Sequence, residues 1–481
     1  MRILQAASEA FPFCKTGGLA DVVGTLCQKL GEAGHDVLLF LPKYRVIAPA
    51  ALRGGKTTFL EVPLGPGRVR VVLRRVQWRS VVVQFVDCPE LFDRDCIYGE
   101  DGRDYPDSDK RFSVFCRAAL EGAKAVDFRP DIVHAHDWPT ALAPLYLATL
   151  YARDPFFAAS ASVLTVHNMA YQGVFPARGF LQAGFAAPQF RTARLGSGRG
   201  GAARYSFLKA GLVHADRLNT VSPTYAGEIQ TAVGGHGLQT VLRRRRGQLT
   251  GILNGLDLEC WNPEKDAFLP ARFSAKDMAG KRECKKKFLA RYGLKAAAGA
   301  PLVGMIGRLD RQKGWDVAIQ ALGPRLRRCC FMGMGEGERK LVASVKKWTA
   351  RHPGAARFFC GYNEELAHCL YAAADIIVMP SRFEPCGLGQ MIAMRYGCVP
   401  VVSCTGGLAD TVSDYPPGNG FTAIPDDARD FGRALDRALD AFAGPDWETM
   451  SRAGMGRDFS WGRSVRLYLD VYARALAGRV G

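Results

Sequence analysis

Two turns of similar sequence, Lys15-Thr16-Gly17-Gly18-Leu19 and Cys404-Thr405-Gly406-Gly407-Leu408, decide the predicted fold of this chain. Each follows a short apolar run and precedes an Ala-Asp pair, Ala20-Asp21 or Ala409-Asp410. A strand, a Gly-Gly turn and a helix start in both halves indicate two doubly wound halves that face each other. Glycine lets the backbone come close to a phosphate, and a helix N-terminus offers free N–H groups. Because only the first copy has a lysine, we expect the two turns to differ in role.

Length and composition are those of an ordinary globular protein. A chain of 481 residues is too long for one core and fits two domains. It is 48% hydrophobic and 23% charged, and its apolar runs are shorter than the ~18 residues of a membrane span. The N-terminal residues do not read as a signal or transit peptide, and the 14 cysteines show no Cys-x-x-Cys pair. We therefore expect a cytoplasmic protein without membrane contact.

The net charge of +18 leaves two interpretations open. Arginines cluster at 68–79, 191–204 and 243–246, which nucleic-acid binding would explain. No nucleic-acid-binding motif or interleaved aromatic residue accompanies them, so an anionic small substrate or a solvated surface is favoured.

Strand and helix patterns alternate along both halves. Buried strands are predicted at Ile3–Ala7 and Val37–Leu41, an antiparallel excursion at 70–83 and a mobile Gly-rich segment at 197–201. The second half restarts with a strand at 301–306. It continues with predicted helices at 315–322, 339–350 and 364–373, which alternate with predicted strands at 329–332, 357–360, 375–379 and 399–403. The fold class is therefore α/β, with two Rossmann-like doubly wound domains across a deep cleft. The expected divisions are an N-terminal domain at 1–250, a linker at 251–270, a C-terminal domain at 271–460 and a final helix at 461–481 that packs back on the first domain.

Two loops of the second half carry residues suited to a phosphorylated sugar. Arg308 and Lys313 flank a strand-to-helix turn, where they can bind phosphate oxygens or merely be solvated. Glu384 follows a strand that ends at Pro380, and we expect Gly387 and Leu388 to begin the next helix. A carboxylate beside a helix start suits a sugar hydroxyl next to a diphosphate; the alternative is that Glu384 caps the helix.

Histidines follow two apolar strands of the first half, in His134-Ala135-His136-Asp137-Trp138 and in His167-Asn168. Three histidines near an aspartate could bind a metal, but His-x-His-Asp matches zinc spacings poorly. We expect no metal and no cofactor, and we interpret these residues as a sugar-recognition group at two adjacent strand ends.

These motifs resemble the family of bacterial glycogen synthases and starch synthases, and they run in order over nearly the whole chain. The motifs are Lys15-Thr16-Gly17-Gly18-Leu19-Ala20-Asp21, His136-Asp137-Trp138, His167-Asn168-Met169-Ala170-Tyr171-Gln172-Gly173, Thr220-Val221-Ser222-Pro223-Thr224-Tyr225, Asn254-Gly255-Leu256-Asp257, Gly307-Arg308-Leu309, Gln312-Lys313-Gly314, Glu384-Pro385-Cys386-Gly387-Leu388 and Thr405-Gly406-Gly407-Leu408. The resemblance implies the GT-B fold and a retaining glucosyltransferase that takes ADP-glucose as donor and glycogen or an α-1,4-glucan primer as acceptor.

The resemblance also implies residue roles. Arg308 and Lys313 neutralise the leaving diphosphate, Glu384 holds the donor glucose hydroxyls, and Asp137 is an active-site acid. His167 and Asn254 contact the donor sugar, and Tyr362 stacks on adenine. The remaining substrate-binding positions are Lys15, Gly18, Asp21, Cys386, Gly387, Leu388 and Thr405.

Three departures from the wider family are visible. Ile392 stands where many retaining relatives have a second glutamate, which is typical of the glycogen synthase branch, and Gly389 replaces the commoner threonine. Residues 191–204 lack the usual acidic, aromatic stretch, so the resemblance does not extend to this loop or to a part for it in acceptor binding. Two rival functions remain: another retaining glycosyltransferase that uses a UDP- or GDP-sugar, and a catalytically silent glucan-binding scaffold.

Overall fold

The computed structural model describes residues 1–52, 54–100, 103–197, 203–295, 297 and 299–480. The chain forms two compact units. Unit 1 comprises Met1–Val221, Ala226–Ile252 and Trp461–Gly481, and unit 2 comprises Ser222–Tyr225 and Leu253–Ser460. The segment 251–270, expected as a linker, enters unit 2 at Leu253. The segment expected to be mobile, 197–201, lies outside the described residues from Gly198 on.

Unit 1 is built on a nine-stranded sheet in the order β14-β13-β9-β8-β1-β2-β5-β4-β3. Seven strands run parallel, namely β1 (Arg2–Ala6), β2 (Asp36–Pro42), β5 (Val81–Asp87), β8 (Ile132–His136), β9 (Ala161–Val166), β13 (Arg217–Thr220) and β14 (Leu249–Gly251). The strands β8 and β9 are buried along their whole length, because helices cover both faces of a parallel sheet.

The expected antiparallel excursion is confirmed at one edge of this sheet. The strand β4 (Gly67–Trp78) pairs antiparallel with both β3 (Lys56–Leu64) and β5. Its side chains alternate between exposed and more buried positions, as in a strand with one face toward water.

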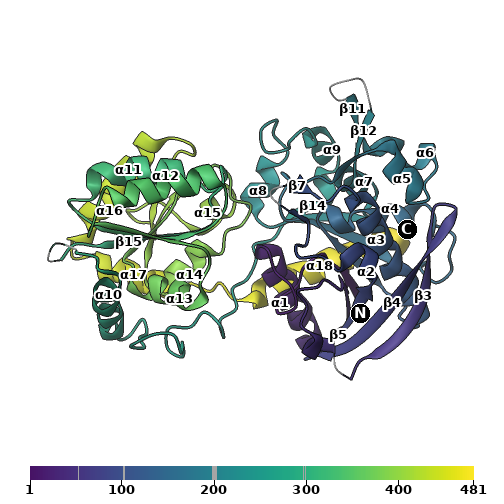
Figure 1. The fold of residues 1–481 in the computed structure, drawn as a ribbon, viewed down its shortest axis with the longest axis horizontal. Coiled ribbons are helices and arrows are strands. Elements are labelled where there is room, and N and C mark those ends of the chain that lie inside the picture. Colours follow the sequence, from purple (N-terminus) through teal and green to yellow (C-terminus); the bar gives the residue numbers. More distant parts are fainter. Residues whose placement is uncertain (53, 101–102, 198–202, 296, 298, 481) are drawn as a thin grey trace. The chain divides into compact units, whose positions relative to one another are not determined.

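The helices of unit 1 pack around this sheet (Figure 1). In α1 (Gly18–Glu32) the buried Val22, Val23, Leu26 and Leu30 form one apolar face. The C-terminal helix α18 (Trp461–Val480) belongs to unit 1 and contacts α1 and β9. The other elements are α2 (Pro89–Phe92), α3 (Ser108–Ala125), α4 (Leu142–Ala148), α5 (Ala177–Gln182), α6 (Ala187–Phe190), α7 (Phe207–His214), α8 (Pro223–Glu228), whose first residues belong to unit 2, α9 (Gln239–Arg244), β6 (Gly99–Glu100), β7 (Arg103–Asp104), β10 (Val174–Pro176), β11 (Arg194–Ser197) and β12 (Ala203–Ser206).

Unit 2 is a six-stranded parallel sheet in the order β17-β16-β15-β18-β19-β20. Alternate residues of its central strand serve two cores: Leu302 packs in one apolar cluster, and Val303 and Met305 pack in the other. Figure 1 shows α11, α12 and α16 on one face of this sheet and α10, α13 and α14 on the other. Two doubly wound halves, predicted from the repeated Gly-Gly turns, are therefore confirmed.

The bounds in unit 2 follow the predicted pattern closely. The strands are β15 (Leu302–Ile306), β16 (Cys330–Gly335), β17 (Ala356–Cys360), β18 (Ile376–Met379), β19 (Val399–Ser403) and β20 (Phe421–Ala423), and the helices are α10 (Ala279–Tyr292), α11 (Trp315–Leu322), α12 (Arg339–Ala350), α13 (Glu364–Ala373), α14 (Gly389–Arg395), α15 (Gly406–Thr411), α16 (Ala428–Phe442) and α17 (Trp447–Met455).

One prediction was wrong at the start of α14. Gly387 and Leu388 were expected to open this helix, but it begins at Gly389. Gly387 has a φ of +73°, in the left-handed region, so it cannot belong to a right-handed helix. The residue turns the chain into the helix instead.

Candidate functional site

In unit 1, the first Gly-Gly turn is held from inside by a buried carboxylate. Glu9 accepts hydrogen bonds from the backbone N–H groups of Thr16 and Gly17, the latter at 3.2 Å. The hydroxyls of Thr16 and Tyr98 also donate to Glu9, at 2.7 and 2.5 Å. Some of the N–H groups that were expected to face a phosphate are thus bonded to Glu9, and Glu9 fixes the shape of the turn.

The two Gly-Gly turns differ in what surrounds them. No heavy atom lies within 4 Å of the place where a Cβ of Gly17 or Gly18 would stand. In the second copy, a Cβ on Gly406 would lie 2.0 Å from the carbonyl oxygen of Glu384, and one on Gly407 would lie 2.0 Å from that of Cys386. The second turn therefore uses its glycines to admit the loop that carries Glu384, whereas the first leaves open space. The two turns thus differ in packing, and their expected difference in role stays a prediction.

Lys15 and Asp21 form a surface pair at the first turn. The Lys15 Nζ lies 2.7 Å from Asp21 Oδ2, and 44% of the Lys15 side chain is exposed. Because an exposed pair of this kind contributes little to stability, Lys15 can exchange Asp21 for an anionic ligand at small cost.

The carboxyl ends of β8 and β9 bring Asp137, His136 and His167 together. The strands are parallel neighbours, with His136 opposite Thr165, so the predicted adjacency of these polar residues is confirmed. His136 Nδ1 lies 3.0 Å from His167 Nε2. Asp137 Oδ1 accepts the backbone N–H of His167 at 2.6 Å. Asp137 has a φ of +57°, an uncommon conformation for a non-glycine residue and one that recurs at functional sites.

Burial sets the protonation of these groups. Burial raises the pKa of Asp137 to about 7, although the N–H groups of His167 and Asn168 act in the opposite direction. Burial lowers the pKa of His167 to about 3 and that of His136 well below its ordinary value. The histidines are therefore neutral at physiological pH, and Asp137 titrates near neutrality.

A chain of buried hydrogen bonds leads from His167 to the C-terminal helix. His136 Nε2 lies 2.8 Å from Gln5 Oε1, and Gln5 Nε2 donates to the Tyr472 hydroxyl at 3.1 Å. The same hydroxyl lies 2.8 Å from His134 Nδ1. Tyr472, His134 and His136 are inaccessible to solvent. Residues of β1, β8 and α18 thus position the ring of His167 jointly.

In unit 2, Lys313 and Glu384 form a partly buried ion pair. Lys313 Nζ lies 2.6 Å from Glu384 Oε2, and the side chains are 21% and 6% exposed. The Ser381 hydroxyl donates to the same oxygen at 3.0 Å. The turn that carries Lys313 approaches closely at Gly314, where a Cβ would lie 2.0 Å from the carbonyl oxygen of Pro380. Lys313 therefore pairs with a carboxylate and is not merely solvated.

Arg308 is the more accessible cation of this turn. Its side chain is 48% exposed and lies 3.3 Å from Asp310 and 3.2 Å from the Gln312 amide oxygen. The Arg308 backbone is fixed because its carbonyl accepts the indole N–H of Trp315 at 3.0 Å. A guanidinium on a fixed backbone with an exposed head can bind an incoming anion.

Asn254 and Cys386 are buried neighbours in unit 2. Burial raises the pKa of Cys386 to about 12, so this thiol is not a nucleophile at neutral pH. Asn254 is 6% exposed, and its amide oxygen has no hydrogen-bond partner among the described residues. A buried acceptor of this kind calls for a donor, such as a ligand hydroxyl or water.

The remaining predicted positions in unit 2 lie at strand ends and helix starts. Tyr362 is 60% exposed just before α13, which suits a stacking surface. Thr405 is the buried N-cap of α15. Leu388 packs against one apolar cluster of unit 2.

The predicted site residues thus fall into two groups. Unit 1 holds Lys15, Gly18, Asp21, Asp137 and His167, and unit 2 holds Asn254, Arg308, Lys313, Tyr362, Glu384, Cys386, Gly387, Leu388 and Thr405. Sequence reasoning missed Glu9, Gln5, Tyr472 and Ser381. A polar residue inside or directly after the first apolar strand was the available signal for Gln5 and Glu9, whereas nothing local pointed to Tyr472.

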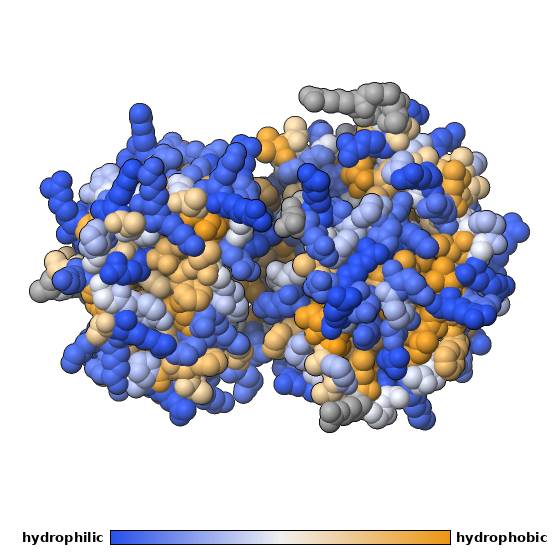
Figure 2. All heavy atoms as spheres, in the orientation of Figure 1, coloured by the Kyte–Doolittle hydropathy of each residue, from blue (hydrophilic) through white to orange (hydrophobic). Residues whose placement is uncertain are grey.

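The arginine clusters include residues with structural partners. The Arg245 guanidinium donates to the carbonyls of Leu212, Val213 and Ala215 at 2.5–2.8 Å, at the end of α7. Arg74 pairs with Asp87 at 2.6 Å. On the face drawn in Figure 2, hydrophilic side chains are spread widely among hydrophobic ones. Part of the positive charge therefore serves the fold.

Comparisons with known proteins agree over the whole chain. Residues 2–244 match the family model for the starch synthase catalytic domain, and residues 300–441 match that for glycosyl transferases group 1. Glycogen synthase of Elusimicrobium minutum is 41% identical over 99% of this chain and 100% of its own length. Glycogen synthase of Myxococcus xanthus is 42% identical over 98% of this chain and 99% of its own.

A solved structure gives the same result. The catalytic domain of Starch Synthase IV from Arabidopsis thaliana, bound to ADP and acarbose, matches with a TM-score of 0.90 and 35% identity, covering 99% of both chains. Within the described residues, no helix is long and apolar enough to cross a membrane. The chain has the GT-B fold and belongs to the glycogen and starch synthase family of glycosyltransferases.

Proposed function

We propose that this glycosyltransferase moves glucose from ADP-glucose to the non-reducing end of an α-1,4-glucan, with retention of the anomeric configuration. The observation that carries the proposal is the Lys313–Glu384 pair, a buried carboxylate held by a cation and by Ser381, with the half-exposed Arg308 on the same turn as Lys313. This arrangement suits a nucleotide sugar, because the carboxylate can accept sugar hydroxyls while the cations face the diphosphate.

Stabilisation of the leaving group is the main task we assign to unit 2. Negative charge develops on the diphosphate as the bond to glucose breaks, and preorganised cations lower the barrier for that step. Arg308 and Lys313 are such cations, and both stand on one fixed turn between β15 and α11. The Glu384 carboxylate already holds the Lys313 side chain, so donor binding changes the contacts of Lys313 and does not have to order a free side chain.

Recognition of the glucose ring falls to residues of both units. Glu384 accepts donor hydroxyls, and the buried amide of Asn254 supplies an acceptor or donor beside Cys386. From unit 1, neutral His167 contacts the sugar, and Asp137 contributes an acid whose pKa near 7 lets it hold or release a proton. Lys15, Gly18 and Asp21 offer the open turn to the donor.

No protein nucleophile is assigned. Glu384 is committed to Lys313 and Ser381, and the raised pKa of Cys386 keeps its thiol protonated. We therefore propose front-side attack by the acceptor hydroxyl, which transfers its proton to the departing phosphate oxygen. Retention then follows without a glucosyl-enzyme intermediate.

ADP-glucose is proposed over other donors for two reasons. The Arabidopsis relative is described with ADP bound, and the exposed Tyr362 offers a ring for adenine. UDP- and GDP-sugars stay rival donors, because a stacking ring alone does not distinguish one base from another.

All fourteen cysteines are thiols in the structure, which supports the reducing cytoplasm as the place of the reaction.

A donor panel tests the proposal. The full chain is incubated with ADP-, UDP- or GDP-glucose and a glycogen primer, and released diphosphate and incorporated glucose are measured. We expect the highest kcat/KM with ADP-glucose. A preference for UDP- or GDP-glucose would refute the donor, and glucan binding without turnover of any donor would favour the silent scaffold.

A further inference from the structure

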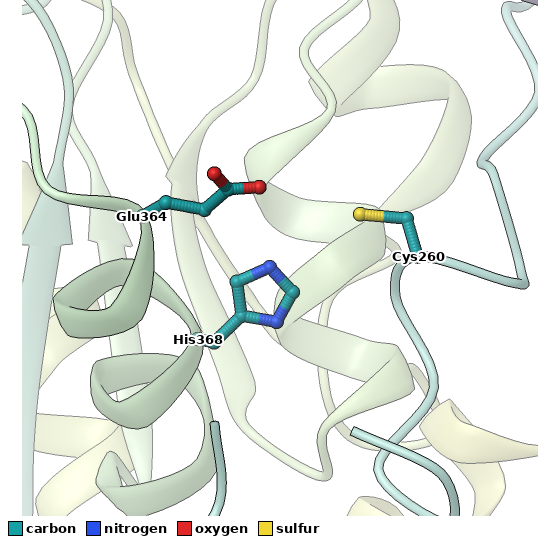
Figure 3. Close-up of side chains that lie close together, drawn as sticks. All are labelled: Cys260, Glu364 and His368. Carbon is teal, nitrogen blue, oxygen red and sulfur yellow. The ribbon is translucent and has the colours of Figure 1, made fainter. Parts of the chain in front are cut away.

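Three metal-ligating side chains meet in unit 2, outside the residues assigned a role above. One ligand atom each of Cys260, Glu364 and His368 lies within 4.8 Å of the other two. Glu364 and His368 stand one turn apart on α13, and Cys260 comes from the segment that leads into unit 2 (Figure 3). Sulfur, carboxylate and imidazole are the three ligand types that zinc accepts in proteins.

The ring of His368 is fixed in one orientation. His368 Nδ1 lies 2.7 Å from Asp266 Oδ2, which also accepts the Tyr396 hydroxyl at 2.6 Å. The indole of Trp261 stacks on the imidazole at 4.0 Å with an interplanar angle of 9°. Because the Asp266 oxygen is the acceptor in this contact, the imidazole proton lies on Nδ1.

The other ring nitrogen is left with a lone pair. His368 is 2% exposed, and its Nε2 has no hydrogen-bond partner among the described residues. Figure 3 shows a ring nitrogen facing the Glu364 carboxylate and the Cys260 sulfur, and since Nδ1 is bound to Asp266 this nitrogen is Nε2. A buried acceptor without a partner is costly, and a cation would satisfy it.

The other two side chains suit an entering ion. Both Cys260 and Glu364 are exposed, so an ion can reach them from solvent and their side chains can adjust to coordination distance. A carboxylate that contacts the ring nitrogen facing away from the metal, as Asp266 does here, usually orients a zinc-bound histidine.

We propose that Cys260 Sγ, a Glu364 carboxylate oxygen and His368 Nε2 bind a divalent ion of the zinc class, with water in the fourth position. Bound metal would tie the segment that carries Cys260 to the first turn of α13. The site is structural and separate from the transfer chemistry, which uses none of these three residues.

Cobalt binding tests the site on the full chain. The protein is stripped with EDTA and titrated with Co²⁺, whose absorption reports thiolate ligation, and Zn²⁺ is then added to displace it. Cys260→Ser and Glu364→Gln remove ligands from exposed positions, where folding is preserved. Cys96→Ser is the matched control, since Cys96 is an exposed thiol of unit 1.

The outcomes are distinct. Wild type and Cys96→Ser are expected to show the thiolate-to-cobalt band, to lose it to Zn²⁺, and to gain melting temperature with Zn²⁺. Cys260→Ser loses the band, and Glu364→Gln weakens Co²⁺ binding by at least the ~10-fold typical of a lost supporting ligand. Absence of the band in wild type, or an unchanged band in Cys260→Ser or an unchanged affinity in Glu364→Gln, would overturn the proposal.

Discussion

At the scale of single residues, Glu384 is the position on which the mechanism depends. Glu384→Gln keeps the shape of the side chain but loses the charge that pairs with Lys313 and accepts donor hydroxyls. We expect turnover to fall sharply while ADP, which lacks glucose, still binds. Calorimetry measures the binding of ADP to this variant.

The same residue also tests the absence of a nucleophile. Intact-mass analysis of wild-type enzyme after incubation with ADP-glucose alone is expected to show no glucosyl adduct. An adduct on Glu384 or Asp137 would replace front-side attack by double displacement.

Lys313 and Arg308 differ in their surroundings, so their alanine variants are expected to differ in stability. Each loses a cation from the leaving diphosphate, and kcat should fall by roughly 10²–10³. Lys313→Ala also removes the cation that pairs with the buried carboxylate of Glu384, so this variant should lower the unfolding midpoint, whereas Arg308→Ala at a half-exposed position should not. Urea denaturation and steady-state kinetics on both variants measure these effects; wild-type kcat in either contradicts its role.

The raised pKa of Asp137 predicts that the free energy of unfolding depends on pH. Its pKa rises from 3.8 to about 7 on folding because the folded chain removes water from the carboxyl group, so above pH 7 the folded state bears the full cost of the charged form. The cost, at most ~4 kcal/mol and less after screening by solvent, disappears as pH falls from 7 toward 4. Asp137→Asn should therefore raise the unfolding free energy above pH 7 and have little effect near pH 4. Denaturation across this range, with exposed Asp104→Asn as control, checks it; a gain that is the same at all pH values speaks against a raised pKa.

At the scale of elements, the sequence predicted most of the sheets and helices, because apolar periodicity and Gly-Gly turns are local signals. Helices α12 and α13 and the strand β19 begin and end at the predicted residues. The start of α14 was missed because the positive φ of Gly387 depends on the loop that packs against Gly406. Glu9 was missed for a similar reason: its partners in the first turn become neighbours only after folding.

The helix α18 offers a prediction of its own. Tyr472→Phe removes the hydroxyl that contacts both Gln5 and His134, and leaving such buried groups unpaired costs ~1–3 kcal/mol. Because Gln5 leads through His136 to His167, we also expect kcat to fall. Tyr146→Phe is the matched control, since the Tyr146 hydroxyl is equally buried but donates to the Ala183 carbonyl at 2.9 Å. Equal kinetics in the two variants would show that α18 only stabilises unit 1.

At the scale of the whole molecule, the proposed function depends on many motifs that follow one another along the chain, and not on one local motif. The proposed site residues begin at Lys15 and end at Thr405, and each unit contributes part of them. The sequence indicated which strand ends carry polar groups, since parallel strands place such residues at one edge. The sequence could not indicate how groups such as His167 and Asp137 are protonated, because the loss of water around them arises from tertiary packing.

The central claim is tested most directly by proton NMR of the reaction itself. The full chain is mixed with ADP-glucose and a short malto-oligosaccharide, and the anomeric signals are followed from the first turnovers. We expect one new α-1,4 linkage for each ADP released and no β-linked product. ADP release without chain growth, a β linkage in the first product, or growth only with another nucleotide sugar would contradict the proposed reaction.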